Sequence, residues 1–190
     1  MPHFKLIIIY LFLLTKALTA FSQSKADSIS VTFPKILVFN DKREILLSFD
    51  NNRMAYEVPS IGLLKGPISF KSYVDTFANK IGLVYKSFRL GGIFTYTFPE
   101  QYSTYIRPYF VVQFNSYANG QSFSNSTYKW FSLNNALKEI KYPASAEIVR
   151  KIMKEPKHVW SATFEEYGYT NPVDVSKIKF RIIENFFKLN

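Results

Sequence analysis

The chain of 190 residues contains no cysteine and only two histidines. Without cysteine it forms no disulfide and offers no thiol for a lipid anchor. His3 lies in the first residues and His158 stands alone near Trp160, so we expect neither a transition-metal site nor a histidine base. The absence of a G-x-S-x-G sequence argues against a serine hydrolase of that type.

Acidic residues are also few: 14 Asp and Glu stand against 24 Lys and Arg, giving a net charge of +10. A basic surface favours anionic partners such as nucleotides, polyanions or membrane surfaces. The basic residues are scattered without a run of five, so nucleic-acid binding is not indicated. A basic exported protein with no anionic partner is the simpler alternative.

The N-terminus has the pattern of a signal peptide over residues 1–22. Lys5 precedes an unbroken apolar run of nine residues at 6–14, and small residues at 20 and 22 predict cleavage before Gln23. An uncleaved anchor is the alternative, but nine residues are too few to cross about 30 Å of hydrocarbon. Cleavage would lower the net charge to +8 by removing Lys5 and Lys16. We expect a periplasmic or secreted protein with no membrane attachment after cleavage.

The remaining residues, 23–190, have the length of a single domain, with 47% hydrophobic and 18% aromatic residues over the whole chain. Residues 23–30 are polar and predict a flexible start. The patterns of alternating or β-branched residues predict strands, with turns at 99–103 and 118–126. The expected strands are 35–39, 44–49, 84–88, 92–98, 106–117, 128–131, 159–167 and 177–187. This order around three helices predicts an α/β (α+β) layout with a mixed sheet.

The clearest helix is expected over residues 70–81. Its apolar residues recur at the spacing of one helical face. Ser69 precedes it as an N-cap and Gly82 follows it where a left-handed C-cap belongs. Two further helices are expected at 133–140, capped by Ser132, and at 146–154, opened by residues 143–145.

Around this helix the chain resembles the Nudix family, whose motif reads G-x5-E-x7-R-E-U-x-E-E-x-G-U, with U aliphatic. Residues 59–62 (Pro-Ser-Ile-Gly) stand at the turn before the helix, and Gly82-Leu83 stands at the closing G-U. Residues 35–48 resemble the family's opening hairpin. Residues 129–137 and 142–152 resemble its late segments, so the likeness covers about 33–154, with extra C-terminal strands at 157–190. The resemblance implies an α/β/α sandwich with a mixed β-sheet.

The resemblance also implies hydrolysis of a nucleoside diphosphate linked to another group, assisted by Mg²⁺ held on glutamates. In register with Gly82, the motif's R-E pair falls on Asp75 and Thr76, and its E-E pair falls on Asn79 and Lys80. The earlier glutamate falls on Pro67, and the opening glycine falls one residue before Gly62. Every catalytic acid is therefore absent, and we assign no catalytic residue, no metal ligand and no cofactor.

Between Gly62 and Leu83, one acid stands among three lysines, for a local charge of +2 that would repel Mg²⁺. Such a helix could contact an anion directly, with these candidates: Lys65, Lys71, Lys80 and Arg89. A solvated helix face is the simpler interpretation for the lysines. Arg89 and Arg107 flank strands and could reach a cleft, although arginines at such positions are more often surface or strand-edge residues.

Three hypotheses follow from these patterns. The chain is a non-catalytic Nudix relative that binds a small anionic or nucleotide-like ligand, or a protein, in the former active cleft. Alternatively it is an active hydrolase with acids supplied from Glu57, Asp75 or Glu139. The third possibility is a different α+β fold, such as a cone-shaped ligand-binding domain, with an accidental resemblance.

Two strand patterns bear on other sites. Glu165 and Glu166 are adjacent, so on a strand they point to opposite faces and do not form a carboxylate pair. Phe94, Tyr96 and Phe98 alternate onto one face, which indicates burial against a helix more simply than a ligand groove.

Overall fold

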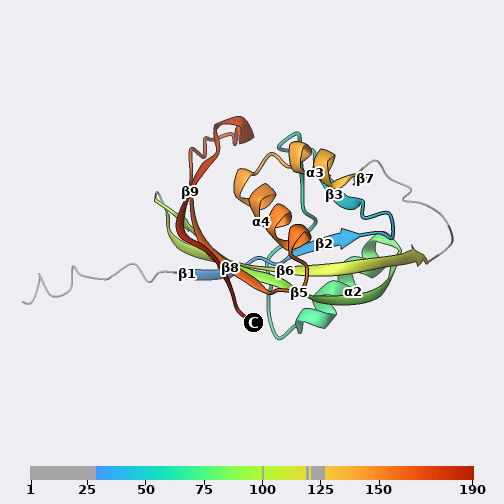
Figure 1. Ribbon diagram of the computed structural model, residues 1–190. Helices are drawn as coiled ribbons and strands as arrows, with labels where there is room; N and C mark the ends of the chain where they lie inside the picture. The colour runs from blue at the N-terminus through green and yellow to red at the C-terminus, as the bar shows by residue number, and fades with distance from the viewer. Residues whose placement is uncertain (1–28, 100, 119, 121–126) are drawn as a thin grey trace, which may run out of the picture.

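The computed structural model describes residues 29–99, 101–118, 120 and 127–190 (Figure 1). The signal peptide expected at 1–22 and most of the turn expected at 118–126 lie outside these residues. The strands are β1 (Ile29–Thr32), β2 (Lys35–Phe39), β3 (Ile45–Asp50), β4 (Ala55–Glu57), β5 (Leu83–Phe98), β6 (Gln101–Tyr117), β7 (Tyr128–Phe131), β8 (Trp160–Tyr167) and β9 (Lys179–Lys188). The helices are α2 (Phe70–Ile81), α3 (Leu133–Glu139), α4 (Pro143–Lys154) and the short 3-10 turn η1 (Val175–Lys177).

The described strands form one mixed sheet in the order β4-β3-β2-β6-β5-β8-β9, with β1 beside β6 and β7 beside β3. The pairs β1–β6, β2–β6 and β5–β8 are parallel, and the other pairs are antiparallel. In Figure 1, α2 covers one face of the sheet while α3 and α4 cover the other. The chain is therefore an α/β/α sandwich, as its sequence predicted.

Strand alternation divides the core into two layers. In β2, Ile36 packs with the α2 cluster and Leu37 packs with the cluster around α3 and α4. In β6, Phe110 and Val111 divide in the same way. Because strand side chains alternate, residues 35 of β2 and 105, 107 and 109 of β6 all face α4. This register decides which polar side chains meet under that helix.

Helix α2 has the bounds, caps and buried face that its sequence predicted. The Oγ of Ser69 accepts a hydrogen bond from the Ser72 amide at 3.1 Å, and Gly82 has φ +67°. The buried face of the helix consists of Tyr73, Val74, Phe77 and Ala78.

Several element boundaries differ from the predictions. The two strands expected at 84–88 and 92–98 are one strand, β5, with a register irregularity between Leu90 and Gly92. Residues 101–103 belong to β6 rather than to a turn, and residues 29–30 belong to β1 rather than to a flexible start, because both segments pair with a neighbouring strand. Helix α4 begins three residues earlier than expected, since proline is compatible with the first helical turn. Ser132 precedes α3, but its side chain makes no capping hydrogen bond.

The loop after β8 depends on Gly168, which has φ +84°. A Cβ at this position would overlap the carbonyl oxygen of Lys177. We expect Gly168→Ala to lower the free energy of unfolding by about 3 kcal/mol, combining left-handed strain with a backbone clash. Gly66 is a matched control, because its φ is +70° and a Cβ there meets no atom within 4 Å.

Urea unfolding measures both variants. Gly66→Ala should lose about 1 kcal/mol from strain alone. Equal losses for the two alanine variants would show that the contact with Lys177 is unimportant.

Candidate functional site

The residues aligned with the Nudix motif lie on α2 and the loop before it. Thr76, Asn79 and Lys80 are exposed on the helix, Pro67 is exposed in the loop, and Gly62 and Gly82 are half-buried. Asp75, the one acid of the helix, binds Lys71 at 2.6 Å and accepts a hydrogen bond from the Tyr85 hydroxyl at 2.6 Å. The hydrogen bond from Lys71, followed by that from Tyr85, lowers the pKa of Asp75. This carboxylate is therefore already occupied by protein donors.

The four residues suggested as anion contacts lie apart: Lys65 in the loop before α2, Lys71 and Lys80 on α2, and Arg89 on β5, opposite Val111 of the cluster around α3 and α4. Lys65, Lys71 and Lys80 are exposed. Arg89 is half-buried, donates from Nη1 to the Leu90 carbonyl at 3.0 Å, and has its pKa lowered by burial. None of the four lines the pocket described below. Their role in anion binding stays a prediction.

The acids suggested as substitute metal ligands are also separated. Asp75 lies on α2, whereas Glu57 contacts α4 on the opposite face of the sheet and Glu139 ends α3. Within the described ranges, no three Asp, Glu or His side chains are grouped as a metal ion requires. Mg²⁺ prefers several carboxylate and water oxygens at about 2.1 Å. The described residues therefore do not fit the magnesium site that the family resemblance implies.

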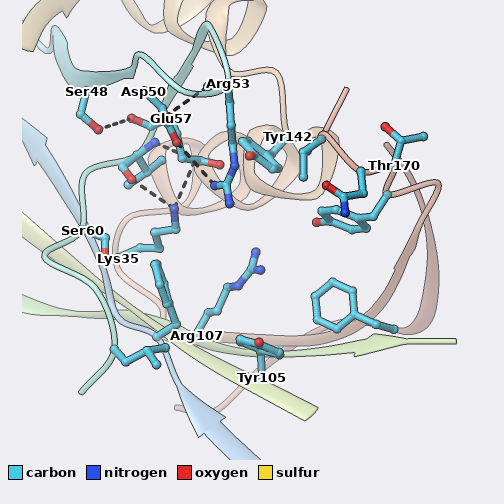
Figure 2. Close-up of a pocket in the computed structure, with 17 residues that line it drawn as sticks. Lys35, Ser48, Asp50, Arg53, Glu57, Ser60, Tyr105, Arg107, Tyr142 and Thr170 are labelled. Carbon is cyan, nitrogen blue, oxygen red and sulfur yellow. Dashed lines mark hydrogen bonds and ion pairs between the residues drawn. The ribbon is translucent and has the colours of Figure 1, made fainter. Parts of the chain in front are cut away.

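A pocket of about 820 Å³ opens on the α4 side of the sheet (Figure 2). Its walls come from β2, β3, β4, β6, the loop after β4, the start of α4 and the loop after β8. Figure 2 shows the side chains of Lys35, Arg53 and Arg107 ending in this cavity. At this size the pocket can enclose a small organic ligand.

Arg107 is the buried cation at the centre of the pocket. Its side chain retains 13% exposure, so the expectation of a surface position at a strand edge is wrong. The register of β6 turns residue 107 toward α4, and the guanidinium stacks 3.8 Å above the Tyr96 ring. Its Nη1 lies 3.9 Å from Glu166 Oε2, and its Nε has no hydrogen-bond partner among the described residues.

Glu166 balances this arginine from the end of β8. Its side chain is fully buried, while Glu165 faces away and pairs with Arg181, so the predicted separation of the two acids is confirmed. The Tyr169 hydroxyl donates to Glu166 Oε2 at 2.6 Å. Burial raises the pKa of Glu166, and the charge of Arg107 opposes that rise.

A second ion pair joins Lys35 and Glu57 at 3.8 Å. Lys35 Nζ donates to the Val58 carbonyl, while Glu57 accepts from the Val58 amide and from the Ser145 hydroxyl of α4. Burial lowers the pKa of Lys35 to about 8, against the raising effect of Glu57. These bonds fix the wall of the pocket where β4 ends.

Helix α2 supports the same wall from the other face of the sheet. The Tyr73 hydroxyl accepts a hydrogen bond from the Ile61 amide at 3.1 Å and donates to the Gly62 carbonyl at 2.8 Å. It also lies 3.0 Å from the Ser60 hydroxyl. Ser60 lines the pocket, so α2 holds in place a loop that leads into it.

Aromatic side chains also line the pocket. Phe94 and Tyr96 are buried in the core as predicted, but Phe98 on the same face lines the pocket. Its ring meets Tyr105 at 5.2 Å and Tyr169 at 5.5 Å, both edge to face. The pocket is not apparent from the sequence, because its residues come from distant segments of the chain. The usable signal was the alternation of Tyr105, Arg107 and Tyr109 along one strand face.

Known structures define the class of fold. The MutT protein from Bacillus halodurans superposes with a TM-score of 0.59 at 16% identity, over 80% of this chain and 97% of that one. A Nudix hydrolase from Nitrosomonas europaea gives 0.52 at 16% identity, over 66% and 90% of the two chains. The C. elegans Ap4A hydrolase gives 0.51 at 13% identity, over 66% and 98%.

The chain therefore has the fold of the Nudix hydrolases, and the resemblance in its sequence is confirmed at that level. The alternative of an unrelated cone-shaped fold is wrong. No family model and no curated protein sequence matches the chain.

The buried Lys35 makes stability depend on pH. Because its pKa is lower in the folded state, the folded protein holds fewer protons between about pH 8 and 10.5, and stability should rise with pH in that window. Between pH 8 and 9.5 we expect a gain of about 1.5 kcal/mol. Denaturant unfolding at the two pH values should show that Lys35→Met lacks this gain.

The exposed Lys65→Met variant serves as the control and should keep the wild-type dependence. A gain in Lys35→Met equal to that of the wild type would contradict the assignment of the effect to Lys35.

Proposed function

We propose that this chain is an exported protein of the Nudix fold that binds a small anionic ligand in the pocket around Arg107, without diphosphate hydrolase activity. The observation that carries the proposal is the guanidinium of Arg107, which is mostly buried, ends in a cavity, and lies beyond hydrogen-bond distance of the nearest carboxylate, that of Glu166. A mostly buried guanidinium without a close carboxylate is costly, and an anion accepting hydrogen bonds from its end would relieve that cost.

The chemistry of α2 supports the absence of hydrolysis. Diphosphate hydrolysis in this family depends on carboxylates that hold Mg²⁺, and the aligned positions carry Pro67, Thr76, Asn79 and Lys80. Asp75 is engaged by Lys71 and Tyr85. The helix in this proposal is a structural support for the pocket rather than a metal-binding element.

An active hydrolase with acids from elsewhere is the second candidate. It is favoured by one observation, the position of Glu57 in the wall of the pocket. Against it, both carboxylate oxygens of Glu57 already accept hydrogen bonds, from the Val58 amide and the Ser145 hydroxyl. A protein partner is the alternative to a small ligand, and binding to nucleic acid is not part of the proposal.

Export remains part of the proposal through the N-terminal pattern at residues 1–22, which predicts a periplasmic or secreted location. In the described part of the chain, no helix has the length and apolar character needed to cross a membrane. Mass measurement of the protein recovered from its native compartment would test whether the chain begins at Gln23.

Catalytic inactivity can be tested with nucleoside diphosphate sugars and dinucleoside polyphosphates in the presence of Mg²⁺. We expect no cleavage of the phosphoanhydride above the buffer rate, as measured by chromatography of the nucleotide products, because the described residues offer no group of acids to hold the metal. An active Nudix hydrolase is the positive control, and Glu57→Gln is the matched variant. Magnesium-dependent turnover that Glu57→Gln abolishes would establish the second candidate instead.

A further inference from the structure

The fixed charges in the pocket wall and directly behind it occur as three pairs of opposite sign, of which only the buried Glu166 does not itself line the cavity. Lys35 faces Glu57 at 3.8 Å, Arg53 faces Asp50 at 3.5 Å, and Arg107 faces Glu166 at 3.9 Å. Their formal charges therefore sum to zero. A polyphosphate carrying three or four negative charges would enter this partly buried space without compensation, which is unfavourable where the dielectric constant is low.

The three cations are not equivalent toward a ligand. Lys35 Nζ already donates to the Val58 carbonyl, and Arg53 lies at the rim with about half of its side chain exposed. Arg107 is buried and fixed by stacking on Tyr96, yet its 3.9 Å contact with Glu166 is too long for a hydrogen bond. A planar guanidinium in this position suits a single carboxylate, which can accept two parallel hydrogen bonds.

The surface around Arg107 is aromatic. The rings that line the cavity are Phe33, Phe98, Tyr105, Tyr142 and Tyr169. Such rings provide flat apolar surfaces for a second ring and prefer edge-to-face or offset contacts. A ligand that places its charge on Arg107 can therefore lay a ring system against these walls.

We infer that the ligand is an aromatic monocarboxylate, with its carboxylate on the guanidinium of Arg107 and its ring among Phe98, Tyr105 and Tyr169. This inference rests on the proposed binding function and specifies the class of ligand. The three ion pairs have no net charge, and the guanidinium of Arg107 is the group available to donate to a ligand. The site therefore suits a ligand with one negative charge.

Calorimetric titration of the mature protein with four probes tests this inference. The probes are 2-naphthoate, its neutral analogue 2-naphthamide, 2-naphthyl phosphate, and ADP with and without Mg²⁺. We expect 2-naphthoate to bind at least tenfold more tightly than the amide and than ADP. Removing the charge-assisted bonds should cost about tenfold to a hundredfold in affinity.

Variants connect the binding to the pocket. Arg107→Lys keeps the charge but loses the planar pair of donors, so it should weaken naphthoate binding by about tenfold or more and leave naphthamide unchanged. Tyr105→Leu should weaken both probes, and it provides a second readout if substitution of the buried arginine impairs folding, which circular dichroism monitors. Lys138→Ala on α3, an exposed residue outside the pocket, is the matched control and should bind as the wild type does.

The outcomes distinguish failure of the monocarboxylate assignment from failure of the proposed anion-binding function. Tighter binding of ADP or naphthyl phosphate than of naphthoate, lost in Arg107→Lys, would overturn the monocarboxylate assignment and leave the proposed anion-binding function standing. Equal binding of naphthoate and naphthamide would overturn it by removing any role for the charge. Absence of binding by every probe would remove both the inference and the function on which it rests.

Discussion

Burial of charge between the sheet and α4 is the constraint on which this pocket depends. Lys35, Glu57, Arg107 and Glu166 are all withdrawn from water. Each would be strongly destabilising alone, and each lies opposite a partner of the other sign. Backbone and hydroxyl groups then complete the arrangement, notably Ser145 on Glu57 and Tyr169 on Glu166. These ion pairs and hydrogen bonds help to fix the positions of the sheet, α4 and the C-terminal segment relative to one another.

The helix that carries the Nudix likeness takes part in this arrangement without contributing charge to it. Its buried face is apolar, and the hydroxyl of Tyr73 reaches the loop at 60–62. The same helix in a metal-dependent hydrolase would present glutamates at the positions of Asn79 and Lys80. The helix supports the loop without acids at these two positions, because its caps and its apolar face come from other residues.

Local patterns in the sequence were sufficient for most of the fold. Apolar spacing and the residues Ser69 and Gly82 defined α2, and alternation defined the strands of the sheet. The break expected between residues 88 and 92 is wrong, because β5 runs without interruption through Gly91 and Gly92. Gly92 accommodates the Trp160 carbonyl and the Phe94 ring rather than a turn.

The candidate site was far less predictable. Its charged residues lie at positions 35, 57, 107 and 166, and only strand register and the crossover to β8 bring them together. A single arginine in a strand gives no sign of whether it faces water or α4. The residues that resemble the Nudix motif lie on α2 and the loop before it, whereas the polar cavity lies on the opposite face of the sheet.

The C-terminal segment beyond α4 makes completion of the pocket a late step in the synthesis and folding of the chain. The loop after β8 closes one wall of the cavity, Glu166 lies behind it opposite Arg107, and β8 pairs in parallel with β5. The sandwich of α2, the first strands and α4 can begin to assemble during synthesis. The cavity cannot close before the loop up to Val173 has emerged, and a chain that ends before Glu166 would leave Arg107 without its counter-charge.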